Sequence, residues 1–174
     1  MYFRSCCRSK KKGLKMEIGE KTINVKIAGL GGMGVLKAAL ILGELMFEEG
    51  FDVKKAEVHG MSQRGGSVAS DVRIGKCVSS PIIPEKEVDF LVSLEPEWSD
   101  VHKISLSENG VVISPDNIDI SQLTSKKALN VALLGVLSKH FDIPVERWLD
   151  TLKNFFPEKL HASNEAAFNL GRNS

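Results

Sequence analysis

The feature that most constrains the fold is residues 24–47, which predict a buried strand, a glycine-rich loop and a long apolar helix. The loop at 29–34 matches the spacing G-x-G-x-x-G, which permits a tight turn, close approach of the backbone to an anion and close packing of helix on strand. The helix that follows is apolar on nearly every side, with one narrow polar stripe at Lys37, Glu44 and Glu48. Such a helix is covered on most sides, so we expect a sheet beneath it and a second chain or domain above it.

Composition limits the classes of protein to which the chain can belong. Its 174 residues are 43% hydrophobic and 26% charged, as in one globular domain with a real core, and a net charge of +1 gives no electrostatic argument for nucleic acid or membrane binding. No apolar run approaches the roughly 20 residues that span a bilayer, so we expect a soluble protein. Cys6, Cys7 and Cys77 form no C-x-x-C motif, so this chain alone supplies neither a zinc ribbon nor a four-cysteine iron–sulfur site. So few cysteines predict a reducing compartment, the cytoplasm.

Residues 1–20 are predicted to be a basic, flexible N-terminal arm before a single domain at 21–174. The arm is rich in lysine and arginine and lacks the apolar core of a secretory signal. Two alternatives stay open. Met16 rather than Met1 is the natural start, or the arm has a function of its own.

The region after the first helix departs from an ordinary dinucleotide-binding domain. Gly50 is predicted to end the helix and a strand follows at 51–58. In NAD-binding domains this strand ends in an acidic residue about 20 residues after the glycines. Glu57 lies 28 positions after Gly29 and is followed by more glycines instead of a helix. NAD binding is therefore the minority interpretation.

The second glycine-rich stretch, residues 59–67, holds an imidazole, two hydroxyls, an amide, a guanidinium and three glycines. Glycines let backbone N–H groups face a ligand, and the guanidinium of Arg64 suits phosphate or carboxylate. The alternative is a long turn in which Arg64 pairs with a neighbouring carboxylate.

The rest of the chain predicts a three-layer α/β/α fold with a Rossmann-like, mostly parallel sheet that has an antiparallel portion. Strands are expected at 68–74, 88–94 and 110–114, with a hairpin turn and return through 75–78. Glu95 follows a strand end and either faces a ligand or caps the next helix. A polar connection at 116–125 leads to helices at 128–137 and after Pro144. A last short helix is capped by Ser163 or Asn164, runs through Phe168 and ends at Gly171. Asn130, embedded in an apolar helix, either supports a nearby loop or contacts a ligand.

Several of these motifs, in this order, resemble the gamma subunit or gamma domain of 2-oxoacid (pyruvate/ketoisovalerate):ferredoxin oxidoreductases. The resemblance runs from about residue 24 to residue 171. The amino acids at His59, Met61 and Gln63 are most similar to those of the small (beta) subunit of indolepyruvate:ferredoxin oxidoreductase. The family usually has glutamine where Met33 stands. The motifs are G-x-G-G-x-G at 29–34, E-V-H-G-M-S-Q-R-G-G-S-V at 57–68, V-R-I at 72–74, Ser80-Pro81, D-F-L-V at 89–92 before Glu95-Pro96, Asn130 with Leu134-Gly135, and N-x-x-A-F-x-x-G at 164–171.

The resemblance implies an accessory role in a larger enzyme. In that family thiamine diphosphate attacks the 2-oxoacid, carbon dioxide leaves, electrons pass through iron–sulfur clusters to ferredoxin, and coenzyme A takes the acyl group. This chain is expected to hold no cofactor, no metal and no catalytic residue. It would pack against the large thiamine and iron–sulfur subunit and help enclose the site, including the coenzyme A end.

On that analogy the two glycine-rich segments line the cofactor or substrate site. The residues are Gly29, Gly31, Gly32, Gly34, His59, Gly60, Ser62, Gln63, Arg64, Gly65, Gly66 and Ser67. Because two apolar helices would be exposed without a partner, we expect the isolated chain to form a homodimer or larger assembly. The alternatives are an NAD(P)-dependent dehydrogenase and a stand-alone module that binds coenzyme A or a nucleotide.

Overall fold

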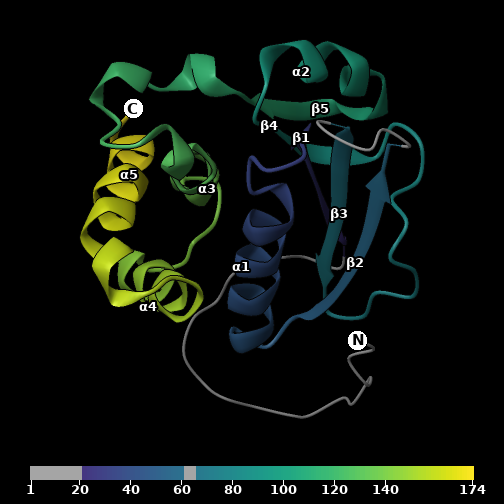
Figure 1. Ribbon diagram of the computed structural model, residues 1–174. Coiled ribbons are helices and arrows are strands. Elements are labelled where there is room, and N and C mark those ends of the chain that lie inside the picture. Colours follow the sequence, from purple (N-terminus) through teal and green to yellow (C-terminus); the bar gives the residue numbers. More distant parts are fainter. Residues whose placement is uncertain (1–20, 61–65) are drawn as a thin grey trace.

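The computed structural model describes residues 21–60 and 66–174 (Figure 1), in which strands and helices form a layered α/β fold. Short 3₁₀ turns occupy several of the connections. In chain order the elements are β1 (Ile23–Leu30), α1 (Val35–Glu48), β2 (Asp52–His59), β3 (Ser67–Gly75), β4 (Val88–Ser93), α2 (Pro96–His102), β5 (Leu106–Ile113), α3 (Leu129–Ser138), α4 (Val145–Phe155) and α5 (His161–Asn173).

The sheet has the order β2-β3-β1-β4-β5, with β1, the first of the described strands, at its centre. β1 pairs antiparallel with β3 and parallel with β4, while β2–β3 is antiparallel and β4–β5 is parallel. The predicted α/β fold with a mixed sheet is therefore confirmed. The sheet is not mostly parallel as predicted, because two of its four strand pairings are antiparallel.

The antiparallel portion comes from a different hairpin than the one predicted. Residues 76–87 form an irregular loop, so the predicted return strand at 77–78 is wrong. The backbone N–H of Val78 donates to the carboxylate of Asp52 (2.7 Å), a side-chain acceptor, and not to a strand partner. The hairpin is instead β2–β3, and β3 lies between β2 and β1.

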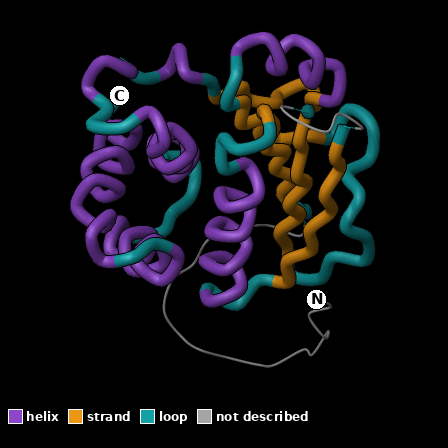
Figure 2. The backbone as a smooth tube through the Cα atoms, in the orientation of Figure 1, coloured by secondary structure: helices purple, strands orange, loops and turns teal. Residues whose placement is uncertain are grey.

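One face of the sheet, which we call the first face, carries the main hydrophobic core and α1. Alternation along β1 directs Val25 and Ile27 to this face, where they pack with residues of α1, α3, α4 and α5. In Figures 1 and 2 these three C-terminal helices gather on the side of α1 away from β2 and β3. α3 and α4 of the same chain pack against one side of α1. Leu40 and Phe47 of α1 stay exposed, so a second chain above this helix remains a prediction.

The second face of the sheet carries a smaller core and α2, which completes the predicted three layers. Leu91 packs there with Val88 and Ile83. Lys26 and Asp71, which face each other across β1 and β3, form an ion pair on this face, close to His102 at the end of α2. No helix in the described ranges is long and apolar enough to cross a membrane.

Helix ends follow the prediction at α1 and depart from it at α5. Gly50 has φ +93° and its N–H donates to Phe47 O (3.0 Å), so it ends α1 as expected. α5 begins at His161 and continues through Gly171 to Asn173, so neither the predicted caps nor the predicted terminator is correct. Gly171 is glycine because α3 crosses there, and a Cβ atom on it would lie 1.8 Å from Ala132 O.

Candidate functional site

The carboxyl ends of β1, β4 and β5 meet at one edge of the sheet, together with the connection between β2 and β3. β1 leads to α1 on the first face, and its neighbour β4 leads to α2 on the second face. Open α/β sheets bind ligands where adjacent connections leave in opposite directions in this way. We call this the switch-point edge and define it by residues 29–34, 59–60, 66–67 and Glu95.

The structure brings the two glycine-rich segments together at this edge. Gly31 N–H donates to Gly66 O (3.0 Å), and Gly60 N–H donates to Ser67 O (2.7 Å). The strand register places Gly29 opposite Val68, which in turn lies opposite His59. Four predicted site residues, Ser62, Gln63, Arg64 and Gly65, lie outside the described residues.

The first glycine loop is a tight turn that depends on backbone conformations rare outside glycine. Met33 N–H donates to Leu30 O (3.1 Å), and Gly32 and Gly34 have φ of +92° and +86°. At the position where the related family has glutamine, the sulfur of Met33 lies 3.4 Å from Leu30 N as a weak acceptor. Met33 therefore supports the turn from inside the loop.

The hydrogen-bond donors that the switch-point edge presents are backbone N–H groups at the start of α1. Gly34 is the N-cap of α1, and in the part of the chain that the structure describes no side chain caps this helix and no acidic residue lies in its first turn. The first N–H groups of a helix lack intrahelical partners and lie at the positive end of its dipole. The arrangement can therefore bind and orient an anionic or carbonyl oxygen.

Asn130, in α3, contacts the first glycine loop of the switch-point edge. Its Nδ2 donates to Gly34 O (3.3 Å), and its Oδ1 accepts from Val131 N (2.9 Å). Of the two alternatives for this buried asparagine, the described contacts show support of a nearby loop. At Glu95, just after β4, the backbone oxygen accepts from Ser93 Oγ (2.5 Å).

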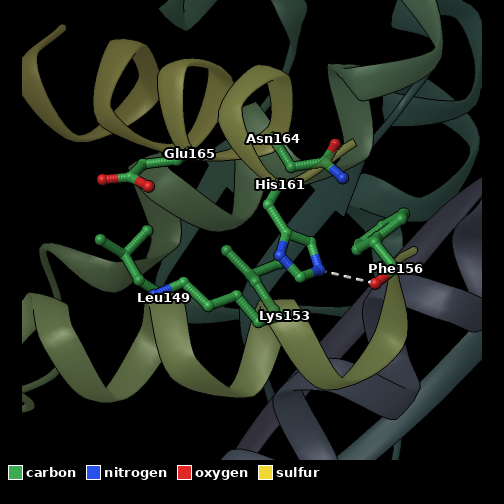
Figure 3. A pocket seen from close by; sticks show the side chains of 7 residues that line it. Leu149, Lys153, Phe156, His161, Asn164 and Glu165 are labelled. Carbon is green, nitrogen blue, oxygen red and sulfur yellow. Dashed lines mark hydrogen bonds between the residues drawn. The ribbon is translucent and has the colours of Figure 1, made fainter. Parts of the chain in front are cut away.

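A second concave site lies between α4 and α5, away from the switch-point edge (Figure 3). In Figure 3, His161 points toward Phe156, whose carbonyl oxygen lies 2.8 Å from the imidazole Nε2. The pocket encloses about 220 Å³ including its open mouth, and the buried Asn164 Nδ2 has no hydrogen-bond partner among the described residues. No predicted site residue lines it, and nothing in the sequence analysis pointed to a pocket there. Its lining residues are Leu149, Leu152, Lys153, Phe156, His161, Asn164 and Glu165.

Comparison with known proteins decides the family. Residues 24–174 match the family model described as pyruvate ferredoxin/flavodoxin oxidoreductase. The chain belongs to this family. The resemblance noted in the sequence is thereby confirmed over nearly all of the described residues.

Curated relatives in this family are subunits of 2-oxoacid oxidoreductases. Indolepyruvate oxidoreductase subunit IorB of Methanothermobacter thermautotrophicus is 42% identical over 73 residues, which are 42% of this chain and 37% of the relative. The common gamma subunit of pyruvate/ketoisovalerate oxidoreductases of Thermococcus litoralis is 30% identical over 129 residues, 70% of this chain and 68% of the relative. The matched region spans 37–45% of the length of the IorB subunits.

Solved structures share the fold. The gamma subunit of a keto/oxoacid ferredoxin oxidoreductase from Geobacter sulfurreducens aligns with a TM-score of 0.70 and 20% identity, over 86% of this chain and 95% of that one. The 2-oxoglutarate:ferredoxin oxidoreductase of Magnetococcus marinus aligns with a TM-score of 0.71 and 19% identity, over 89% of this chain and 31% of that one. At this identity the likeness establishes the fold.

Proposed function

We propose that this chain is an accessory, gamma-type subunit of a 2-oxoacid:ferredoxin oxidoreductase. In that role it helps the oxidative decarboxylation of a 2-oxoacid to an acyl-coenzyme A, with reduction of ferredoxin. The observation that carries the proposal is the family match over residues 24–174. The names of the relatives favour an indolepyruvate-type or pyruvate/ketoisovalerate-type substrate.

In this proposal the switch-point edge lines the mouth of an active site that the large subunit completes. Its first glycine loop supplies N–H donors held by the backbone, so its work is to bind, orient and shield oxygen atoms of a ligand. Coenzyme A is the candidate ligand, because helix N-termini suit phosphate groups.

The proposal assigns thiamine diphosphate and the iron–sulfur clusters to the large subunit. Within residues 21–60 and 66–174 there is no group of three or more His, Cys, Asp or Glu side chains that could hold a metal ion. Cys77 is exposed and supplies one thiolate, whereas an iron–sulfur cluster needs four. When bound in the complex, these groups would supply the electron transfer to ferredoxin in the cytoplasm.

Reconstitution tests the proposal. The purified full chain, supplied with a 2-oxoacid, coenzyme A and oxidised ferredoxin, is expected to show no oxidation alone and to support it once the large subunit is added. The large subunit alone is the control. Oxidation by the solitary chain, or complex activity independent of this chain, would contradict the accessory role.

An NAD-dependent dehydrogenase is disfavoured by the sheet order as well as by the family. β3 separates β2 from β1, so the strand that carries Glu57 is not the neighbour of the glycine-loop strand. The carboxylate of Glu57 pairs with Lys55 Nζ (2.9 Å). Calorimetry with NAD, and with coenzyme A in the absence of the large subunit, distinguishes this alternative and the stand-alone binding module from the accessory role.

We also propose that the isolated chain self-associates as a homodimer. The apolar helix α3 is buried within the chain and α1 is covered only in part. The support comes from exposed apolar side chains, namely Leu40 (45% exposed) and Phe47 (49%) on α1, and Val58 (65%), Val101 (57%) and Ile104 (80%) elsewhere. Sedimentation at micromolar concentration is expected to give a dimer, and a monomer would overturn this part of the proposal.

A further inference from the structure

We infer that Asn130 is a positioning residue for the first glycine loop. It is the second residue of α3 and lies 96 positions after Gly34, whose carbonyl oxygen its amide contacts. The residue is only 4% exposed, so its side chain acts within the protein and does not meet the ligand directly.

The orientation of the Asn130 amide is fixed by its own neighbour. Val131 N–H can only donate, so the atom of Asn130 that accepts from it (2.9 Å) must be Oδ1. The NH₂ group therefore faces Gly34 O (3.3 Å). This oxygen also accepts from Ala38 N–H (2.9 Å), the first hydrogen bond of α1, so Asn130 adds a second donor at the start of the helix.

The fit between Asn130 and the loop is close. A Cβ atom built on Gly34 would lie 2.4 Å from Asn130 Nδ2, and Gly34 has φ +86°. A glycine is therefore needed at position 34 both for its backbone conformation and for the approach of the amide. The peptide that enters α1 is held from both sides, by the turn at Met33 and by Asn130.

The consequence is that α3 sets the direction of the N–H groups in the first turn of α1. The same loop is tied to the second glycine segment through Gly31 and Gly66. One amide from the C-terminal helices thus supports the donors that face the ligand. This last step rests on the proposed function, with an oxygen-rich ligand such as coenzyme A at the edge.

Hydrogen exchange of the full chain tests the positioning role without any activity. Asn130→Ala and Asn130→Asp both lose the donor to Gly34 O, and Asp keeps the size and the acceptor for Val131 N. Amides of residues 31–37 are expected to exchange roughly three- to tenfold faster in both variants, the effect of one lost hydrogen bond. Amides of α5 are expected to stay unchanged.

Ser138→Ala is the matched control on the same helix. Ser138 is fully buried at the other end of α3, where its Oγ donates to Gly135 O (2.6 Å) and accepts from Arg172 (2.7 Å). The Ser138→Ala substitution should loosen the α3–α5 contact and leave the amide exchange of residues 31–37 at the wild-type rate. Wild-type exchange at 31–37 in the Asn130 variants, or the same acceleration in Ser138→Ala, would overturn the inference.

The reconstituted complex tests the link to ligand binding. Both Asn130 variants are expected to raise the KM for coenzyme A about three- to tenfold with kcat little changed, and Ser138→Ala to leave both parameters unchanged. A faster-exchanging loop with an unchanged KM would overturn the link to the ligand. An inactive wild-type complex would instead refute the proposed function, while the exchange experiment would still decide the role of Asn130.

Discussion

Two glycines inside helices, Gly43 in α1 and Gly171 in α5, are alike in sequence context and opposite in their surroundings. A Cβ atom on Gly43 would meet Val53 Cγ1 at 3.7 Å, an ordinary van der Waals contact. A Cβ atom on Gly171 would overlap Ala132 O at 1.8 Å, so two helix backbones would have to separate. The first site has room for a methyl group and the second has none.

Alanine substitutions at these two positions should therefore change stability in opposite directions. Gly171→Ala is expected to destabilise the fold by about 3 kcal/mol, through overpacking against backbone that cannot yield. Gly43→Ala is expected to stabilise it by about 0.5–1 kcal/mol, because alanine favours the helix and restricts the unfolded chain. Urea denaturation of both variants measures this, and equal effects would contradict the close crossing of α3 and α5.

A histidine on the second face gives the fold a dependence on pH. Burial, and then the charge of Lys26, lower the pKa of His102 below its ordinary value of 6.5, while Asp71 acts in the opposite direction. The unfolded chain therefore binds more protons than the folded chain between the lowered pKa and 6.5. The free energy of unfolding must fall as the pH falls through this window.

His102→Gln is expected to reduce that loss of stability. Denaturation midpoints measured at pH 7.5 and pH 5.5 should differ less in the variant than in the wild type. His140 shifts in the same direction through burial and Lys139, so a smaller slope should persist. A variant slope equal to the wild-type slope would show that His102 does not contribute.

For single residues, the sequence indicated which positions are unusual but not which atoms they contact. Asn130 was recognisable as a polar residue inside an apolar helix, and loop support was one of its two interpretations. Its partner, Gly34 O, is a backbone atom 96 positions away and leaves no local pattern. Gly171 looked like a helix terminator for the same reason, because Ala132 O on another helix is invisible to local propensity.

At the scale of elements, the loop at 76–87 is held to the sheet by one side chain of β3. Arg73 donates to Ser80 O (3.0 Å) and Ile82 O (3.0 Å) through Nη1, and to Asn24 Oδ1 (2.9 Å) through Nε. The same asparagine donates to Glu87 O (2.8 Å) at the end of the loop. These contacts explain structurally why the V-R-I and Ser80-Pro81 motifs occur together.

Arg73→Ala should release this loop. The loss of three hydrogen bonds from a charged group is expected to cost about 2 kcal/mol in the free energy of unfolding. Cleavage by thermolysin in the apolar part of the loop, around Ile82, should also be several-fold faster. Arg147→Ala is the control, since its ion pairs to Glu48 and Glu49 lie at the surface away from this loop, partly exposed, and such pairs contribute about 0.2–1 kcal/mol. Equal cleavage rates in the two variants would contradict an anchoring role for Arg73.

Most strands and helices were predictable from periodicity, whereas their pairing was not. Gly75-Lys76 followed by Cys77-Val78 satisfied the local signals for a hairpin. In the structure Val78 N–H donates to the carboxylate of Asp52 instead, and Arg73 anchors the loop. Strand pairing depends on which hydrophobic faces meet in the core, and this information is spread over the whole chain.

At the scale of the whole molecule, the sequence predicted that α1 is covered by a sheet and by a second chain or domain. α3 and α4, more than 80 residues further along the chain, supply part of this cover from within the same chain. The meeting of the two glycine-rich segments followed from their family resemblance. The backbone hydrogen bond from Gly31 N–H to Gly66 O joins these segments. It could be found only from the sheet order, which puts β3 next to β1.

The central position of β1 has a consequence for how the protein is made. Of the described strands this one leaves the ribosome first, and its parallel neighbour β4 follows after about 60 further residues. At roughly 5–20 residues per second, one apolar edge waits about 3–12 seconds during synthesis for its partner. Slowed elongation downstream of codon 30 should therefore promote aggregation of the nascent polypeptide, and early chaperone capture should protect it.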